Sequence, residues 1–265
     1  MIQSSKRLRG RPRAFYDKTS QNRIKALDRA IDVLECLSQR NGMTLTEIAE
    51  KLDESPATVY RVLSTFEARQ AVEMDSASQE WFIGPTSFRL GAAFLRRKDV
   101  VERARPVMRE LMEETGETAN LGAEVSGEVM FLSQVETHEN IRAFFPPGTM
   151  SPMHASGIGK ALLAHADQTR INKYVTRKNL ESFTENTLSN QEQLRAELVK
   201  IKAQGYAFDN EEKSTGMRCV AAPIFNFYGE AIVGISISGP SIRLPLERIE
   251  QVSKMVMEKA NLLSG

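Results

Sequence analysis

A run of small residues ahead of an apolar stretch is the part of this sequence best suited to hold a small anion. Residues 153–163 read Met-His-Ala-Ser-Gly-Ile-Gly-Lys-Ala-Leu-Leu and predict a helix that begins near Ser156. The first backbone N–H groups of a helix lack intrahelical partners and attract anions such as carboxylates. Gly157 has no side chain, so a ligand could approach its main chain closely.

The Gly159-Lys160 pair raises the question of a nucleotide-phosphate loop. That motif requires a glycine at the position of His154 and a magnesium-binding hydroxyl at the position of Ala161. The sequence therefore argues against nucleoside triphosphate binding. We expect Lys160 to be a surface cation or to brace the domain.

Further polar side chains lie in or beside predicted strands. Ser236 and Ser238 are two apart in an apolar strand, so they share one face. Their hydroxyls would either bind the oxygens of a small ligand or satisfy nearby backbone groups, and the spacing leaves both open. Cys219 as nucleophile, His154 as base and Asp209 with its neighbouring glutamates as acid–base groups would instead suggest an enzyme. Nothing in the spacing brings them together, so a cysteine-dependent enzyme is only a distant alternative.

Length and composition limit the class of protein. A chain of 265 residues is comfortable for two domains. No apolar run approaches the roughly 20 residues that cross a bilayer, and no apolar stretch typical of a secretory signal follows the basic N-terminus. Cys36 and Cys219 indicate neither a disulfide framework nor a zinc cluster, and His138 and His165 lack metal-ligand spacing. We expect a cytoplasmic protein with no metal and no cofactor.

Basic residues are concentrated at the start of the chain. The net charge is +1, yet the first 25 residues contain eight basic side chains and one acidic one. Residues 1–22 lack apolar periodicity and predict a flexible basic arm. Within it, Arg9-Gly10-Arg11-Pro12 resembles the core of an AT-hook, in which two arginines enter a narrow A·T-rich minor groove. Arg9 and Arg11 would bind DNA in this way, or the arm would contact phosphates or nothing.

Three closely spaced helices are expected after the arm. Apolar residues recur at helical spacing at Leu27, Ala30, Ile31, Leu34 and Leu37, then at Leu45, Ile48, Ala49 and Leu52, and then at Val59, Val62, Leu63 and Phe66. Thr44 would cap the second helix, and Ser55 followed by Pro56 would start the third. Two short helices of this kind, the second with a small, polar and basic outer face, are typical of a helix-turn-helix.

The outer face of the third helix would read DNA. Small residues near its start would let the backbone enter the major groove, where Arg61 could reach a guanine or a phosphate and Tyr60 a phosphate or base edge. The predicted DNA contacts of this domain are Thr44, Ser55, Ala57, Thr58, Tyr60 and Arg61. Residues 71–74 and 80–83 predict a hairpin that would supply a wing. A helical bundle with a chance hairpin is the alternative.

The remainder alternates strands and helices. The predicted strands are 120–125, 129–135, 141–145, 206–209, 219–225 and 231–238, and the predicted helices begin near Ser156, near Asp167, at Ser189 and at Pro245. Ser189 and Glu192 have the spacing of a capping box. Before these elements, residues 86–115 predict a helical linker that is interrupted at 96–99 and ends at Gly116. The fold class is α+β.

Several motifs, taken in order, resemble one family. Arg-Ala-Ile-Asp-Val-Leu (29–34), Leu-Thr-Glu-Ile-Ala (45–49) and Ser-Pro-Ala-Thr-Val-Tyr-Arg-Val-Leu (55–63) resemble the DNA-binding domain of IclR-type regulators. Segments 205–212, 216–223 and 235–239 resemble the sensors of the same family. The resemblance implies a winged helix-turn-helix (23–85), a helical linker that pairs subunits (86–115) and a GAF-like, or profilin-like, α/β effector-binding domain (116–265).

The resemblance also implies an effector site. The backbone at Gly157 and Ile158 would hold a carboxylate, Asp209 would accept a hydroxyl or hydrate proton, and Cys219, Ser236 and Ser238 would complete the polar set. The walls would come from Phe144, Met150 and Met217. Ile158 is bulkier than the residue often found at its position, which would shrink the cavity. The implied ligand is a small oxo-acid, with glyoxylate favoured over pyruvate.

We therefore expect a transcriptional regulator that binds a double-stranded DNA operator and a small carboxylate effector. It would act as a homodimer or homotetramer, with a dimer contact within residues 27–100. Repression and activation use the same parts, so both stay open. A DNA-binding oligomer without an effector is the alternative.

Overall fold

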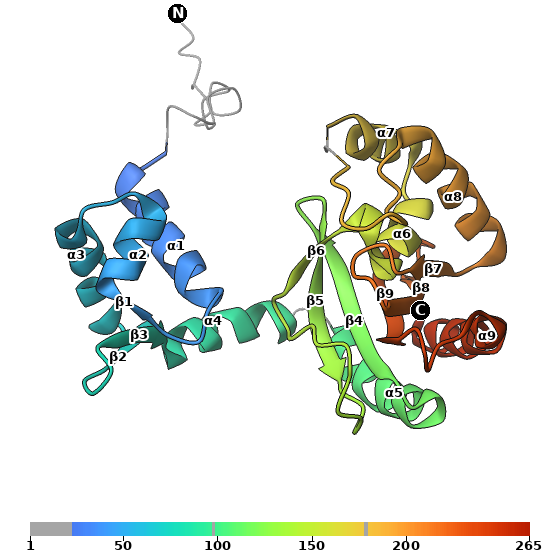
Figure 1. The fold of residues 1–265 in the computed structure, drawn as a ribbon, viewed down its shortest axis with the longest axis horizontal. Coiled ribbons are helices and arrows are strands. Elements are labelled where there is room, and N and C mark those ends of the chain that lie inside the picture. Colours follow the sequence, from blue (N-terminus) through green and yellow to red (C-terminus); the bar gives the residue numbers. More distant parts are fainter. Residues whose placement is uncertain (1–22, 97–98, 178–179) are drawn as a thin grey trace, which may run out of the picture. The chain divides into compact units, whose positions relative to one another are not determined.

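The computed structural model describes residues 23–96, 99–177 and 180–265 (Figure 1). Contacts divide the chain into two compact units, with the boundary after Phe94. The predicted arm, with Arg9 and Arg11, lies outside the described residues. Among the helices of the described segments, none is long and apolar enough to cross a membrane.

The first unit is a winged helix-turn-helix, as predicted. Its elements are α1 (Lys25–Ser38), β1 (Met43–Thr44), α2 (Leu45–Leu52), α3 (Pro56–Glu67), β2 (Val72–Asp75), β3 (Glu80–Ile83) and α4 (Pro85–Arg96). The wing is the antiparallel hairpin of β2 and β3, and the short β1 extends it into a three-stranded sheet of order β1-β3-β2. The carboxylate of Asp75 accepts hydrogen bonds from the N–H groups of Ala77 and Ser78, which closes the turn of the wing.

Two side-chain caps fix where α2 and α3 begin. The Thr44 hydroxyl accepts from the Glu47 N–H at 3.3 Å, and the Glu47 carboxylate accepts from the Thr44 N–H at 2.8 Å, which is a capping box. The Ser55 hydroxyl accepts from the Thr58 N–H at 3.2 Å. Proline at the first position of α3 needs no hydrogen-bond partner for its nitrogen. The sequence predicted both starts correctly.

The apolar stripe of α1 is buried only toward the end of the helix. Leu37 is buried in the core of the first unit, whereas Leu27 and Ile31 are 60% and 52% exposed. The same unit exposes Ile24 ahead of α1 and Phe88 on α4. Helical periodicity alone could not separate the face that packs on the core from the face that is left bare.

The second unit is a six-stranded antiparallel sheet with helices on both faces. Its elements are α5 (Asp99–Thr115), β4 (Thr118–Val125), β5 (Glu128–Val135), β6 (Met150–Pro152), the 3-10 turn η2 (Met153–Ala155), α6 (Gly157–Ala164), α7 (Gln168–Arg177), α8 (Gln191–Gln204), β7 (Ala207–Asn210), β8 (Met217–Phe225), β9 (Ala231–Pro240) and α9 (Leu246–Leu263). The strand order is β6-β5-β4-β9-β8-β7. One core lies between the sheet and helices α5 and α9, and a second lies between the sheet and helices α6, α7 and α8 (Figure 1).

Two predictions about local structure were wrong. Residues 141–145 do not form a strand, because the free edge of β5 pairs with β6 instead. The N–H of Phe131 donates to the carbonyl of Thr149, which extends that pairing toward the preceding turn. Helix α8 is capped by Asn190, whose side chain accepts from the N–H groups of the next turn, and not by Ser189. Asn and Ser are both favoured at the N-cap position, so the sequence alone could not decide which of the two neighbouring residues caps α8.

Helix α5, which was predicted as part of a linker, contributes to the core of the second unit. Ala104, Met108 and Leu111 are buried against the sheet and α9. The helix ends at Gly116, whose φ of +75° is the left-handed conformation that glycine adopts most readily.

Candidate functional site

The outer face of α3 is polar and accessible. Tyr60 is 55% exposed, and Ala57 and Arg61 are also exposed. Thr58 is half-buried, with its hydroxyl 2.8 Å from that of Ser55. The aromatic and guanidinium groups are therefore free to meet a partner, whereas the Thr58 and Ser55 hydroxyls already share a hydrogen bond.

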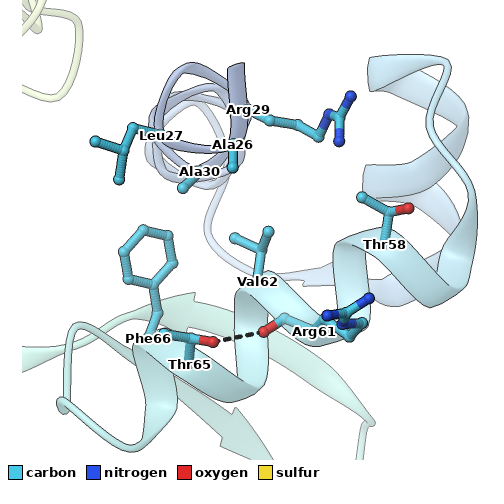
Figure 2. Close-up of a pocket in the computed structure, with 9 residues that line it drawn as sticks. All are labelled: Ala26, Leu27, Arg29, Ala30, Thr58, Arg61, Val62, Thr65 and Phe66. Carbon is cyan, nitrogen blue, oxygen red and sulfur yellow. Dashed lines mark hydrogen bonds between the residues drawn. The ribbon is translucent and has the colours of Figure 1, made fainter. Parts of the chain in front are cut away.

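Figure 2 shows the groove between α1 and α3, with a volume of about 440 Å³. Leu27 and Phe66 stand at its apolar end, and Arg29, Thr58 and Arg61 at the other. Arg29 forms an ion pair with Glu54 at 2.5 Å. The Thr65 hydroxyl donates to the Arg61 carbonyl at 2.7 Å, within the helix.

Thr44 is less available than the α3 residues. Its N–H and its hydroxyl both donate to the Glu47 carboxylate, at 2.8 and 2.9 Å. A contact between Thr44 and a DNA phosphate would have to displace the capping box. The structural role of Thr44 is thus to begin α2.

Glycines place the start of α6 directly against the sheet. Gly122 on β4 pairs with Gly234 on β9, and the Ile158 side chain packs over both. A Cβ at position 234 would lie 2.8 Å from Ile158 Cγ2. Ile158 therefore occupies the space that two glycines leave open. Its bulk is accommodated by the sheet, although the residue still borders the cavity described below.

Two more glycines set the close contacts of α6. A Cβ at Gly157 would lie 2.8 Å from Cys219 Sγ, and a Cβ at Gly159 would lie within 2.7 Å of the Met153 carbonyl carbon. The Ser156 hydroxyl accepts from the Gly159 N–H at 3.4 Å. The Lys160 N–H donates to the Ser156 carbonyl, so Gly157 and Ile158 carry the first unpaired N–H groups of the helix.

The six residues predicted for the effector site line one small cavity. Its walls are formed by Phe131, Phe145, Ser151, Ala155, Ser156, Gly157, Ile158, Asp209, Lys213, Cys219, Ser236 and Ser238. The free volume is about 30 Å³. One water needs roughly 10–15 Å³ on the same measure, so the cavity suits groups of very few heavy atoms.

The predicted apolar walls were wrong. Phe144 and Met150 are exposed, and neither they nor Met217 border the cavity. Phe131 and Phe145 form the wall instead, stacked with ring centroids 4.7 Å apart. Phe145 is less exposed than Phe144 because only Phe145 packs on the ring of Phe131, which lies on β5.

One hydroxyl in the cavity has no partner. Ser236 Oγ is buried and forms no hydrogen bond of good geometry. It lies near the Cys219 thiol, whose pKa it lowers slightly. Ser238 Oγ accepts from the Asn120 amide at 3.2 Å, and Asn120 accepts from Gln134 at 3.0 Å. Buried polar groups are rarely left unpaired, so the Ser236 hydroxyl is available to a polar group that enters the cavity.

A buried charged cluster adjoins the cavity. Lys160 is not at the surface: it is fully buried and donates to the Glu212 carboxylate at 2.5 Å and to the Phe208 carbonyl at 2.7 Å. Asp209 accepts from the Glu212 N–H at 2.8 Å. Burial raises the pKa of Asp209 to about 6 and that of Glu212 to about 7, while Lys160 opposes both shifts. The bracing role expected of Lys160 is the one the structure supports.

The geometry does not favour a cysteine nucleophile. Burial, with a smaller contribution from Asp209, raises the pKa of the Cys219 thiol to about 11, which keeps it protonated at neutral pH. The ring nitrogens of His154 lie 3.1 Å from the Tyr174 hydroxyl and 2.9 Å from the Glu181 carbonyl. Within the described segments, no three His, Cys, Asp or Glu side chains are placed to hold a metal ion.

Several cavity residues were missed from the sequence. Lys213 lies in the acidic run after Asp209, which reads as a solvated loop. Asn120, which does not line the cavity but donates to Ser238, is one of many polar residues on a strand. Ser151 and Phe131 sit on neighbouring strands, and only their pairing brings them together. No local pattern marks these residues, because they meet through the register of the sheet.

A winged helix-turn-helix joined to an α/β domain with a small cavity lined by aromatic, serine and charged side chains defines a class of DNA-binding transcriptional regulators. The family models identify which one. The IclR helix-turn-helix domain matches residues 26–76, and the bacterial transcriptional regulator IclR C-terminal domain matches residues 92–265. The chain belongs to the IclR family of transcriptional regulators, as the sequence motifs indicated.

Known relatives agree with this assignment. The chain is 54% identical over 261 residues to the HTH-type transcriptional regulator BhcR of Paracoccus denitrificans, covering 97% of this chain and 94% of the relative. It is 34% identical over 255 residues to the transcriptional repressor IclR of Escherichia coli, covering 95% and 93%. The crystal structure of an IclR regulator from Alicyclobacillus acidocaldarius superposes with a TM-score of 0.81 at 27% identity, covering 91% and 98%.

Proposed function

We propose that a small oxo-acid controls the DNA binding of this IclR-family regulator. Glyoxylate is favoured over pyruvate. The observation that carries the proposal is the unpaired, buried hydroxyl of Ser236 in a cavity that also contains the N-terminus of α6. The carboxylate would accept from the N–H groups of Gly157 and Ile158. The carbonyl or hydrate oxygens would meet Asp209, Ser236 and Ser238.

The small volume supports the choice of acid. About 30 Å³ of free space beside the stacked rings of Phe131 and Phe145 favours an acid of few heavy atoms over an aromatic one. Pyruvate has a methyl group where glyoxylate has the aldehyde hydrogen, so it needs more space. Glyoxylate therefore ranks first.

Operator contacts are proposed for the exposed face of α3. Arg61 and Tyr60 would reach the major groove, with Ala57 allowing a close approach of the backbone. Ser55 and Thr58 would contribute phosphate contacts at the start of α3, whereas a phosphate contact by Thr44 would require its capping box with Glu47 to open. Arg9 and Arg11 of the arm would add contacts outside the described residues. Exposed Ile24, Leu27 and Ile31 support pairing of two copies through the first unit, as a dimer or as part of a tetramer.

The test is binding to DNA from upstream of the chain's own gene, at fixed salt, with and without glyoxylate and pyruvate. The proposal expects tight binding that glyoxylate changes at least tenfold and pyruvate changes less. Tight binding that neither acid alters would favour the second candidate, an oligomeric DNA-binding regulator without an effector. Thermal stabilisation by glyoxylate separates the two candidates independently, because a ligand that binds only the folded state raises its stability.

A further inference from the structure

Lys213 is a cation on the cavity wall that neither the sequence motifs nor the proposed site includes. It lies in the turn between β7 and β8, and its side chain borders the same cavity as Gly157 and Asp209. Its ammonium nitrogen is 3.2 Å from the centroid of the Phe183 ring. This cation–π contact restricts the flexible Lys213 side chain to a position over the Phe183 ring.

The turn that carries Lys213 is itself held in place on both sides of the residue. The Thr184 hydroxyl donates to the Glu211 carbonyl at 2.7 Å, and the Thr187 hydroxyl donates to the Glu212 carbonyl at 2.6 Å. The Gly216 N–H donates to the Glu211 carboxylate at 2.7 Å. The backbone on which Lys213 stands is thus fixed relative to the segment that contains Phe183.

The negative charge on the cavity wall favours a cation at this position. Asp209 already places a carboxylate on the wall, and Lys160 is engaged by Glu212. Of the described residues that line the cavity, Lys213 alone carries a positive side chain. Without Lys213, a bound acid would lie near the Asp209 carboxylate, and only the weak positive end of the α6 dipole would balance the negative charge of the acid.

Partial burial makes Lys213 receptive to an anion. Desolvation lowers the pKa of its ammonium group, and the carboxylates of Glu181 and Glu128 only partly offset this. An anion in the cavity would restore the interactions that burial removes.

We infer that Lys213 forms the ion pair with the carboxylate of the effector and thereby selects acids over neutral molecules of the same size. This inference rests on the proposed function and adds to it the residue that recognises the charge. The acid would bridge Lys213 and the N-terminus of α6, with its other end toward Ser236.

The test is a calorimetric titration of glyoxylate into the full chain and three variants. Lys213→Met keeps the aliphatic stem over Phe183 and removes the charge, and Lys213→Arg keeps the charge. Lys200→Met removes an exposed lysine of α8 as a control. Loss of a charge-assisted hydrogen bond predicts about tenfold to a hundredfold weaker binding for Lys213→Met. Lys213→Arg should stay within about fivefold of the parent, and Lys200→Met should match it.

The outcomes separate the inference from the proposed function. The melting temperature of each variant without glyoxylate shows whether the variant is folded. Equal affinity in Lys213→Met and the parent, or equal loss in the Met and Arg variants, would overturn the role of the charge and leave the effector site standing. If the parent binds neither glyoxylate nor pyruvate, the proposed function fails and this inference fails with it.

Discussion

The two units of this regulator place their polar residues in opposite environments. On α3, Arg61 and Tyr60 are exposed, whereas Asp209 and Ser236 are buried in the wall of one small cavity and Lys160 is buried beside it. An exposed side chain can change without disturbing the fold. A buried one shares its environment with its neighbours, so its chemistry depends on the packing of the whole unit. The first unit should therefore lose function without losing stability, and in the second unit the two should be coupled.

The largest effect is expected where backbone segments touch. Gly159→Ala would push a methyl group into the backbone of Met153 and should reduce the free energy of unfolding of the second unit by about 3 kcal/mol. Gly91→Ala, on an exposed face of α4 with open space around it, is the control and should be neutral or stabilising. Urea unfolding measures the free energy of unfolding of each variant. Equal stability of the two variants would contradict the close packing of α6.

A smaller change at the neighbouring glycine should affect the ligand first. Gly157→Ala places a methyl group 2.8 Å from Cys219 Sγ, at the point where the carboxylate would approach. We expect glyoxylate affinity to fall by about 100-fold, roughly 2.7 kcal/mol. Adding Cys219→Ala makes room for the methyl group and should restore part of the affinity. Calorimetry of the single and double variants decides, and no recovery in the double variant would argue against a steric cause.

In the first unit, the corresponding experiment removes one guanidinium group. Arg61→Ala should weaken operator binding by about tenfold to a hundredfold, because a good contact to a base is worth roughly 1–3 kcal/mol. Its melting temperature should not change, since Arg61 is exposed. Arg89→Ala removes the same charge from the exposed surface of α4 and serves as the control. Fluorescence anisotropy with a labelled operator measures the affinity. Unchanged binding by Arg61→Ala would overturn the assignment of the DNA-reading face.

The smallest effect concerns pH. Burial raises the pKa of Asp209 to about 6 in the folded chain, so the folded state keeps a proton that the unfolded state has released. Its contribution to stability should therefore grow as the pH falls from 8 to 5.5, by about 1 kcal/mol. Asp209→Asn should lack this part of the pH dependence, whereas Glu247→Gln at the exposed start of α9 should keep it. Unfolding curves without ligand at both pH values test this. Parallel pH profiles for the parent and Asp209→Asn would contradict the buried carboxylate.

The same contrast explains what the sequence could predict. The helix starts after Thr44 and Ser55 and the hairpin of the wing follow from local patterns and caps, and the structure has them where expected. Residues 141–145 have the alternation of a strand, yet the edge they would need is taken by β6. A pattern states what a segment can form, and the rest of the fold decides whether a partner is available.

The cavity shows the limit more clearly. Gly157, Asp209 and Ser236 stand out because family motifs contain them, and they do meet in space. Lys213 and Phe145 belong to the same cavity but lie in segments that read as a solvated loop and a strand. Their roles come from the stacking on Phe183 and Phe131, contacts between segments 14 to 30 residues apart in the chain. No short-range pattern encodes such contacts.

The most direct test of the account is whether the hydroxyl of Ser236 connects the cavity to DNA binding. Ser236→Ala removes a buried group that has no partner, so the variant should be at least as stable as the parent. Operator affinity of both proteins is measured by fluorescence anisotropy at fixed salt, with and without glyoxylate. The account predicts that glyoxylate changes the affinity of the parent at least tenfold and that of Ser236→Ala much less at the same concentration. An equal response in the two proteins would contradict a sensor built around this cavity.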